Sequence, residues 1–434
     1  MNGEFLVEWN PWWGKEVNFN YFERDLQEEI LKWVRRREVI GLLGVRRSGK
    51  TTLMYLIINF LLKSGVRKEN ILFIKADDNR VSKEGLIQES IDSYKELMNP
   101  KGRVFVFIDE VQEIKEWSGT LKRFYDLNQG FKFFVSGSNS SMLKEDLSFK
   151  LAGRVVYFEL FPFSFKEFLK SRVNVEDKIQ ILSKKNEVKH FLLEYLEFGG
   201  FPEIIMEKDK KMKNQLLIFY YDTIIYRDVV KRRKIRFTSK IEKMINFYLQ
   251  NVSKLVNFTK VGKQVFLSTD TVVEYTKFLQ DAFFIFYVPI FDYSVKKQEV
   301  NPKKIYCVDS GLRNAKGFKF SNDFGKLYEN TVFIELKRKI SNNPLSNIFY
   351  WKGKNECDFL IKKGNEIIEA IQVVYDLNEE NKQREINGLI EALEEFNINK
   401  GLIITRDYEG IEEVEGKKIE FVPLWKWLLK EDLK

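Results

Sequence analysis

The chain has 434 residues, of which 44% are hydrophobic and 31% charged, and this length predicts two or three packed domains. The net charge of +9 permits a nucleic-acid partner without requiring one. One histidine, His190, and two cysteines, Cys307 and Cys357, are too few for zinc sites built on His/Cys sets, Ser-His-Asp triads or a disulfide framework. The chemistry therefore has to rest on carboxylates, Lys, Arg and a hard cation.

The sequence also bears on the compartment. No apolar run approaches the roughly 20 residues that cross a bilayer, and the N-terminus lacks a basic-then-apolar signal pattern. Together with the low cysteine content, these features favour a cytoplasmic protein with no membrane partner.

Residues 1–163 predict an α/β domain with a parallel sheet covered by helices, because short β-rich runs alternate with helical stretches. The predicted strands are Glu38–Leu43, Ile71–Lys75, Val104–Ile108, Lys132–Val135 and Val155–Leu160.

A phosphate-binding loop is predicted between the first strand and the apolar helix that follows. Residues Gly44–Thr51 match the P-loop pattern G-x-x-x-x-G-K-[ST] in this strand-to-helix context, although a glycine turn capping an ordinary helix is the alternative. The loop amides and the helix N-terminus would face the phosphates of ATP. Lys50 would neutralise phosphate charge and act in catalysis, and Thr51 would ligate Mg²⁺. The other predicted nucleotide contacts are Gly44, Arg47, Ser48, Gly49 and Thr52.

Two acids end the predicted strand Val104–Ile108. Asp109 would hold Mg²⁺ through water, and Glu110 would polarise the attacking water. The separation from the P-loop leaves room for the strand Ile71–Lys75. This spacing is typical of P-loop proteins in which an extra strand separates the two motifs and the catalytic acid directly follows the metal-binding Asp.

Two further segments supply candidates for contact with the γ-phosphate. Ser136 or Ser138, after the strand Lys132–Val135, would sense the γ-phosphate or water, and Ser138 is the one assigned to catalysis. A simple Gly/Ser turn explains the same pattern. Arg154 would stabilise developing phosphate charge, in one interpretation across a subunit interface of a homo-oligomer, whereas a lone Arg is more often a surface residue. The alternatives to it are Arg46, Arg47 and Arg227.

The motifs together resemble the archaeal and bacterial AAA+-type ATPases that carry a C-terminal nuclease-like domain. The segments that carry the resemblance are Asn10–Trp13, Gly44–Thr51, Asp109–Gln112, Ser136–Ser138, Leu151–Arg154 and Gly199–Pro202. The resemblance implies an AAA+-like core (1–163), a helical lid (164–250), a winged helix (251–299) and a degenerate restriction-endonuclease-like domain (300–434). It also implies that Trp12 or Trp13 lines the adenine pocket; a core anchor is the alternative.

The segment 251–299 reads as helix, turn, helix and a β-like run. The first helix is predicted over Phe258–Phe266, and a capping-box pattern starts the second at Thr271. Ser294–Gln298 and Pro302–Lys304 would form a basic wing.

DNA is the partner predicted for this segment. Contact with DNA would use Thr269, Thr271 and Glu274, with lysines on phosphates. The alternative is a packing or protein-interaction module. The densest basic run, Lys231–Arg236, is either a phosphate track or a solvated helix face.

The last domain lacks a complete nuclease site. A nuclease of the restriction-endonuclease type needs a helix acid, a hairpin acid, and an acid and a lysine one residue apart on the next strand. Glu329 and Asp358 supply the first two, but Gln372 and Val374 occupy the other positions. We therefore expect an ATPase that couples its nucleotide state to domain movement on DNA, with no nuclease activity. A signalling ATPase with protein partners is the alternative.

Overall fold

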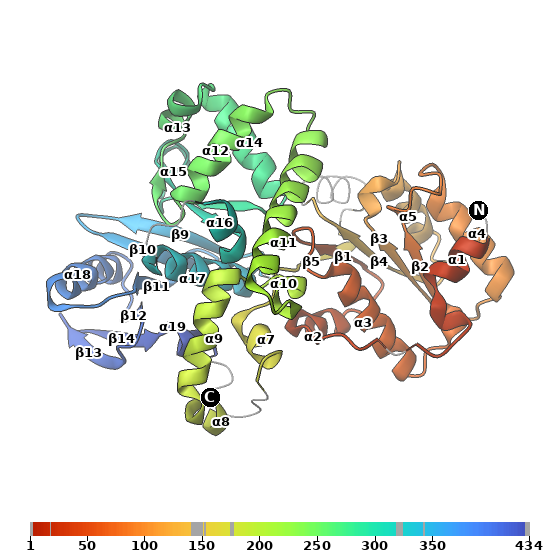
Figure 1. The fold of residues 1–434 in the computed structure, drawn as a ribbon, viewed down its shortest axis with the longest axis horizontal. Coiled ribbons are helices and arrows are strands. Elements are labelled where there is room, and N and C mark those ends of the chain that lie inside the picture. Colours follow the sequence, from red (N-terminus) through yellow and green to blue (C-terminus); the bar gives the residue numbers. More distant parts are fainter. Residues whose placement is uncertain are drawn as a thin grey trace. The chain divides into compact units, whose positions relative to one another are not determined.

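The computed structural model describes residues 3–17, 19–139, 151, 153–173, 178–317, 324–341 and 343–429. The chain forms two compact units (Figure 1). The first comprises residues 1–161 with 281–283, and the second comprises residues 162–280 with 284–434. Among the described helices, none combines the length and the apolar character that a bilayer crossing requires.

The first unit is built on a five-stranded parallel sheet with the order β2-β3-β4-β1-β5, which confirms the predicted α/β class. Its strands are β1 (Val39–Leu43), β2 (Ile71–Lys75), β3 (Val104–Asp109), β4 (Phe131–Gly137) and β5 (Val155–Glu159). Every residue of β1 and β3 is buried, which explains why both strands are continuous apolar runs in the sequence. The strand that separates β1 from β3 in space is β4, whereas β2, which lies between them in the sequence, forms an edge.

Helices cover both faces of this sheet. They are α1 (Gly3–Trp9), α2 (Asp25–Leu31), α3 (Lys50–Lys63), α4 (Leu86–Met98) and α5 (Trp117–Asp126), with the short helices η1 (Pro11–Trp13), η2 (Lys68–Asn70) and η3 (Val111–Glu113). The path from β1 to β2 runs across the sheet in one direction, and the paths from β2 to β3 and from β3 to β4 run back. Because such crossovers are right-handed, α3 lies on one face and α4 and α5 on the other (Figure 1).

The tryptophans of the N-terminal segment anchor it to the sheet. The indole N–H groups of Trp12 and Trp13 donate to the carbonyl oxygen of Ile71, at 3.4 and 2.9 Å, and both side chains are buried. Ile71 begins β2, whereas Lys75, at the other end of this strand, pairs with Asp109. The indoles thus lie at the edge of the sheet opposite to the acids. These contacts favour the core-anchor alternative. The Trp12 ring also lies 6.5 Å from the ring of Tyr55 on α3, and a place beside the adenine stays a prediction.

The second unit begins with helices. These are α7 (Phe165–Lys170), α8 (Lys178–Ser183), α9 (Lys185–Phe198), α10 (Pro202–Met206), α11 (Lys210–Asp222), a π-helix η4 (Thr223–Lys231) and α12 (Thr238–Gln250). The 3–4 spacing of apolar residues predicts this helical character. Helices α9 and α11 both pack against α16 (Ser310–Lys316).

A small antiparallel sheet with the order β6-β8-β7 follows. Its elements are β6 (Leu255–Val256), α13 (Phe258–Val265), α14 (Thr269–Asp281), β7 (Ile285–Val288), α15 (Val295–Val300) and β8 (Lys303–Cys307). The predicted basic wing is wrong. Residues 295–300 form a helix, and the side chains of Lys303 and Lys304 are buried. The second helix begins two residues before Thr271, after Ser268, whose hydroxyl oxygen accepts the Thr271 N–H at 3.1 Å.

A six-stranded mixed sheet with the order β13-β14-β12-β11-β10-β9 completes the second unit. Its elements are α17 (Phe324–Ile340), β9 (Ser346–Lys352), β10 (Glu356–Lys363), β11 (Glu366–Val374), α18 (Glu379–Glu395), β12 (Lys400–Thr405), β13 (Gly410–Val414), β14 (Lys417–Pro423) and α19 (Leu424–Leu428). The apolar face of α18 packs on β10, β11 and β12, so that Cys357, Leu389 and Ile403 share one core.

Candidate nucleotide site

The loop between β1 and α3 requires glycine at two positions. A Cβ atom on Gly44 would lie 2.2 Å from the carbonyl oxygen of Leu160, so no side chain fits there. Gly49 has φ +94°, a left-handed conformation that L-residues rarely adopt, and α3 begins at the next residue, Lys50. The loop therefore passes close to the end of β5 and turns sharply into the helix N-terminus, where backbone N–H groups have no partner within the helix.

Two side chains of the loop region are suited to a phosphate ligand. The ammonium of Lys50 is buried and donates to the carbonyl oxygens of Gly44 at 2.9 Å and Val45 at 3.2 Å. The hydroxyl oxygen of Ser48 is buried and has no hydrogen-bond partner among the described residues. Buried polar groups rarely lack a partner, so this oxygen fits a site where a ligand supplies one.

Asp109 connects the loop helix to the strand ends. Thr51 Oγ1 donates to Asp109 Oδ2 at 2.7 Å, and the Ser136 hydroxyl donates to the other carboxylate oxygen. Burial raises the pKa of Asp109, and the charge of Glu110 raises it further. The hydrogen bonds from Ser136 and Thr51 act in the opposite direction. The P-loop, Asp109 and Ser136 thus lie together at the carboxyl edge of the sheet.

The neighbouring acid, Glu110, is held in an unusual backbone conformation. Its φ of +53° is left-handed, which is uncommon for a residue other than glycine. Its N–H donates to Ser136 Oγ at 3.0 Å, and the side-chain amide of Gln112 donates to its carboxylate. Ser136 therefore contacts both acids: its hydroxyl donates to the Asp109 carboxylate, and its oxygen accepts the backbone N–H of Glu110.

The other predicted site residues lie around the loop, after β4 or in the second unit. Ser138 is buried beyond β4, but it is Ser136 that contacts Asp109. Arg47 is exposed with φ +72°, and Thr52 follows Thr51 on α3. Arg227 belongs to the second unit.

Arg154 lies away from the P-loop of its own chain. Its carbonyl oxygen accepts the N–H of Val39 at the start of β1, at 2.8 Å, whereas the P-loop follows the end of that strand. Its guanidinium pairs with Asp126 at 3.2 Å. Ala152, in the same motif, lies outside the described residues. A role at the phosphates of its own chain is therefore incompatible with the fold.

Sequence reasoning missed two residues of the site. Arg24 is buried, and its guanidinium donates to the carbonyl oxygens of Ser48 at 2.9 Å and Phe161 at 2.8 Å. Tyr55 lies one helical turn after Thr51, and its burial, followed by the charge of Asp109, raises its pKa to about 12. No motif marks either residue. The hydrogen-bond partners of Arg24 are distant in the sequence, and Tyr55 is held by ring contacts, among them one with Phe73 at 5.0 Å.

Comparisons with known proteins identify one recognised domain. Residues 36–169 match the family model described as AAA domain. Residues 189–322 and 324–427 match two models described as domains of unknown function, DUF8612 and DUF4143.

Several relatives match most of the chain, two of them at 30% identity or more. An uncharacterised protein of Methanocaldococcus jannaschii is 36% identical over 89% of this chain and 87% of its own length. An uncharacterised protein of Haemophilus influenzae is 30% identical over 89% of this chain and 93% of its own. Among solved structures, RuvB of Thermotoga maritima matches with 16% identity and a TM-score of 0.31, over 62% of this chain and 90% of that one.

Proposed function

The chain belongs to the family of its Methanocaldococcus and Haemophilus relatives and carries an AAA domain over residues 36–169, and from this premise we propose that it binds ATP with Mg²⁺, hydrolyses it and transmits the nucleotide state to its second unit. One observation carries the proposal. The hydroxyl of Thr51, in the first turn of α3, donates a hydrogen bond of 2.7 Å to the carboxylate of Asp109, which ends β3. Two segments far apart in the sequence therefore meet where a phosphate-bound metal ion would have to lie.

The residues fit a magnesium nucleotide. Mg²⁺ prefers oxygen ligands and is commonly held by one or two protein oxygens together with substrate phosphates. The Thr51 hydroxyl and the Asp109 carboxylate provide such oxygens, and within the described residues no group of three or more His, Cys, Asp or Glu could hold a metal ion alone. Bound Mg²⁺ would neutralise phosphate charge. The main-chain amides of residues 44–52, with Lys50, would bind the phosphates.

Hydrolysis requires a group that orients water. Glu110 is the best candidate, because it follows Asp109 directly and its backbone is fixed by Ser136. Arg154, which cannot reach its own P-loop, could stabilise phosphate charge only in a neighbouring subunit, so its role depends on a homo-oligomer.

Turnover of ATP by the full chain tests this assignment. Glu110→Gln should bind ATP with near wild-type affinity and lose roughly 10²- to 10⁴-fold in kcat, the range for loss of a general base. Glu113→Gln, an acid on the adjacent helix η3, is the matched control and should keep its activity. Wild-type turnover by Glu110→Gln would contradict the assignment.

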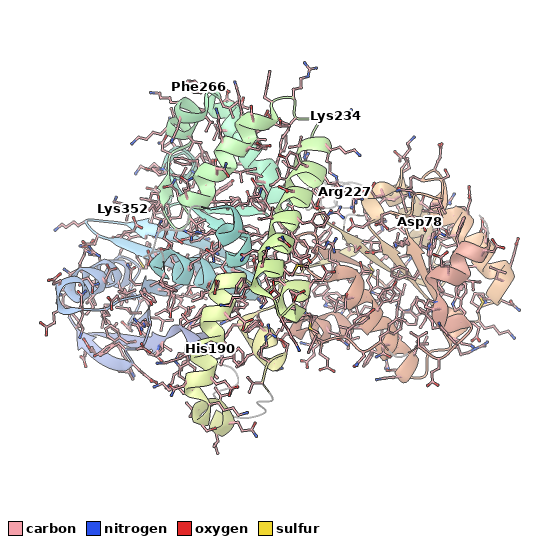
Figure 2. The ribbon with its side chains drawn as sticks, viewed as in Figure 1. Asp78, His190, Arg227, Lys234, Phe266 and Lys352 are labelled. Carbon is pink, nitrogen blue, oxygen red and sulfur yellow. The ribbon has the colours of Figure 1, made fainter. Side chains whose placement is uncertain are left out.

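We further propose nucleic acid as the partner of the second unit. Lys240 Nζ donates to the carbonyl oxygen of Phe266 at 2.9 Å and lies 5.4 Å from the ring centroid of Phe237. Both phenylalanines are exposed, at 61% for Phe237 and 77% for Phe266. Lys234 and Arg236 are also exposed, and Figure 2 labels Lys234 and Phe266 in this part of the unit.

Exposed aromatic rings beside basic side chains favour single-stranded over duplex nucleic acid. Exposed aromatic rings stack on unpaired bases, and neighbouring cations bind the phosphates. The helix expected to enter a major groove, α14, instead exposes Asp270 and Glu274, which repel phosphates. The order of the elements α12, β6, α13, α14, β7 and β8, with α15 between the last two strands, resembles that of a winged helix. This supports the proposed domain type without requiring duplex recognition.

Anisotropy of a labelled single strand, titrated at several salt concentrations, tests the partner. Phe237→Ala and Phe266→Ala should each weaken binding by roughly 5- to 150-fold, from about 1–3 kcal/mol per stacked base. Phe60→Ala, which removes an exposed phenylalanine of the first unit, should have no effect. Absence of salt-dependent binding, together with slow ATP turnover that DNA does not change, would favour the signalling ATPase with protein partners.

A further inference from the structure

Lys304, on β8, is buried among three carboxylates. Its Nζ lies 2.7 Å from Asp358 Oδ1, 2.8 Å from Glu356 Oε1 and 3.1 Å from Glu329 Oε1, and its side chain is only 2% exposed. A lysine ammonium has three N–H donors and no acceptor. Two of these donors go to Asp358 and Glu329, and Glu356 forms a further ion pair with the same ammonium.

The three carboxylates come from two elements outside the small sheet that contains β8. Glu329 lies on α17, whereas Glu356 and Asp358 lie on β10 of the six-stranded sheet. Other groups hold their oxygens in place. The hydroxyl of Tyr306 donates to Glu329 Oε1 at 2.7 Å, and the N–H of Val373 donates to Asp358 Oδ2 at 2.9 Å.

The electrostatics favour a charged lysine at this position. Burial opposes the ammonium form of Lys304, but the charges of Asp358 and Glu329 outweigh it and raise the pKa of the lysine well above its usual value. Burial raises the pKa of Glu329, the charge of Lys304 opposes this shift, and the charge of Asp358 adds to it. An isolated buried carboxylate pair would be costly, and the ammonium offsets that cost.

The oxygens surround Lys304 at hydrogen-bond distances, which are longer than the 2.0–2.1 Å of Mg²⁺–oxygen bonds. Gln372 is also engaged elsewhere. Its Oε1 accepts the N–H of Asp358 at 3.0 Å, and its Nε2 donates to Glu385 at 2.7 Å. We propose that Glu329, Glu356 and Asp358 form a cation site whose permanent occupant is the ammonium of Lys304, which ties β8 to the C-terminal sheet and excludes a divalent metal.

This proposal assigns a role to the two acids that a nuclease would use. They bind a cation supplied by the chain itself, so the C-terminal sheet is joined to the preceding small sheet by an ion cluster. It concerns the second unit alone and does not rest on ATP hydrolysis.

Metal binding by the full chain without nucleotide tests the proposal. The melting temperature of the wild-type protein should not change with Mn²⁺. Electron paramagnetic resonance should detect the same amount of bound Mn²⁺ in the wild type and in Asp358→Asn. Lys304→Ala should melt several degrees lower, and Mn²⁺ should restore part of the loss, because three carboxylates then face one another without a cation. Mn²⁺ binding by the wild-type protein that Asp358→Asn abolishes would overturn the proposal, as would a Lys304→Ala variant that Mn²⁺ does not stabilise.

The neighbouring lysine provides a matched control. Lys303 is also buried on β8, but its ammonium donates to backbone carbonyls at the end of α15, including those of Glu299 at 2.7 Å and Asn301 at 3.0 Å. Lys303→Ala should also lower the melting temperature, but Mn²⁺ should not restore it.

A double-mutant cycle keeps the proposal testable if Lys304→Ala does not fold. Lys304→Met combined with Asp358→Asn removes one charge of each sign. The double variant should melt higher than the sum of the two single losses predicts. Additive losses would show that the two residues are not coupled and would overturn the proposal.

Discussion

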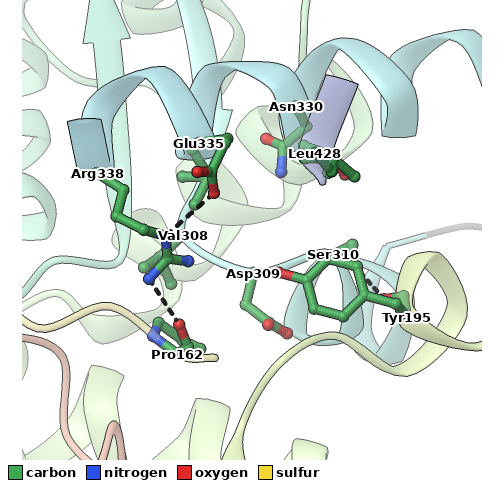
Figure 3. Close-up of a pocket in the computed structure, with 11 residues that line it drawn as sticks. Pro162, Tyr195, Val308, Asp309, Ser310, Asn330, Glu335, Arg338 and Leu428 are labelled. Atoms are coloured by element: carbon green, nitrogen blue, oxygen red, sulfur yellow. Dashed lines mark hydrogen bonds and ion pairs between the residues drawn. The ribbon is translucent and has the colours of Figure 1, made fainter. Parts of the chain in front are cut away.

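The carboxylate of Asp309 accepts the backbone N–H of Gly200 at 2.7 Å and so holds the turn between α9 and α10 against the start of α16. The same carboxylate accepts the N–H of Leu312 at 3.1 Å and caps α16. Asp309 and Tyr195 line a cavity of about 20 Å³, room for about one water molecule (Figure 3). Burial raises the pKa of Asp309 to about 6, although hydrogen bonds from the backbone, led by Gly200, oppose the shift.

This contact explains the first glycine of the turn, Gly199, and gives a stability prediction. A Cβ atom on the second, Gly200, would instead lie 2.3 Å from the carbonyl oxygen of Phe163. A Cβ on Gly199 would lie 2.0 Å from Asp309 Oδ1, and the residue has φ +77°. We expect Gly199→Ala to lower the free energy of unfolding by several kcal/mol. Urea denaturation, followed in the transition that reports unfolding of the second unit, measures this loss.

Gly364 is the matched control, because it has φ +61° but a Cβ atom added to it would meet no other part of the described chain within 4 Å. Gly364→Ala should cost only the left-handed strain of about 1–2 kcal/mol. If both alanine variants lost the same stability, the contact with Asp309 would not be the reason for glycine at position 199.

A buried lysine of β4 predicts a dependence of stability on pH. Burial lowers the pKa of Lys132 to about 7, and the charge of Arg103 adds to the shift. An unfolded chain has a lysine pKa of about 10.4, so between pH 7 and 10 the unfolded state binds a proton that the folded state does not. Stability relative to Lys132→Met should therefore rise with pH across this window, by at most about 1.4 kcal/mol per pH unit.

Calorimetric melts of both proteins at pH 7, 8, 9 and 10 measure this difference, and titrations shared by the two proteins cancel. A difference that stays constant, or falls as the pH rises, would contradict the assigned burial effect.

Local patterns in the sequence predict much of the first unit. The buried strands of a parallel sheet are continuous apolar runs, and β1, β2 and β3 are visible as such. The P-loop and the acids Asp109 and Glu110 are likewise contiguous motifs, so the sequence predicts them without knowledge of the fold.

Long-range partners explain the expectations that failed. The sequence pattern predicts Lys304 as part of an exposed basic wing, but its partners Glu329 and Asp358 lie 25 and 54 positions further along the chain. No local pattern reports such partners. The anchoring of Trp12 also depends on a distant partner, because only its hydrogen bond to the carbonyl oxygen of Ile71 shows that its indole lies at the start of β2.

Arg24 should matter for nucleotide affinity although it is remote in sequence from the P-loop. Its guanidinium donates to the carbonyl oxygens of Ser48 and Phe161, so Arg24→Ala removes two buried hydrogen bonds that hold the loop. We expect ATP to bind roughly 10- to 100-fold more weakly, from about 1.5–3 kcal/mol for hydrogen bonds to a charged group. Arg24→Lys should rescue little, because an ammonium lacks the planar fork that reaches both carbonyls.

Calorimetric titration with ATP measures the affinity, and Arg36→Ala, which removes an arginine near the surface of the same unit, is the control. Wild-type affinity in Arg24→Ala would mean that the loop keeps its shape without this side chain.

The two serines after β4 can be distinguished by kinetics. Ser136 donates to Asp109 and accepts the N–H of Glu110, so Ser136→Ala removes a contact to each acid. We expect kcat to fall by roughly tenfold or more, since a buried hydrogen bond of about 1–3 kcal/mol is lost where the acids must be positioned. Ser138→Ala, at the residue that the sequence favours as the sensor, should lower kcat less. Steady-state ATP turnover of both variants decides between them, and a larger loss in Ser138→Ala would return the sensor role to that residue.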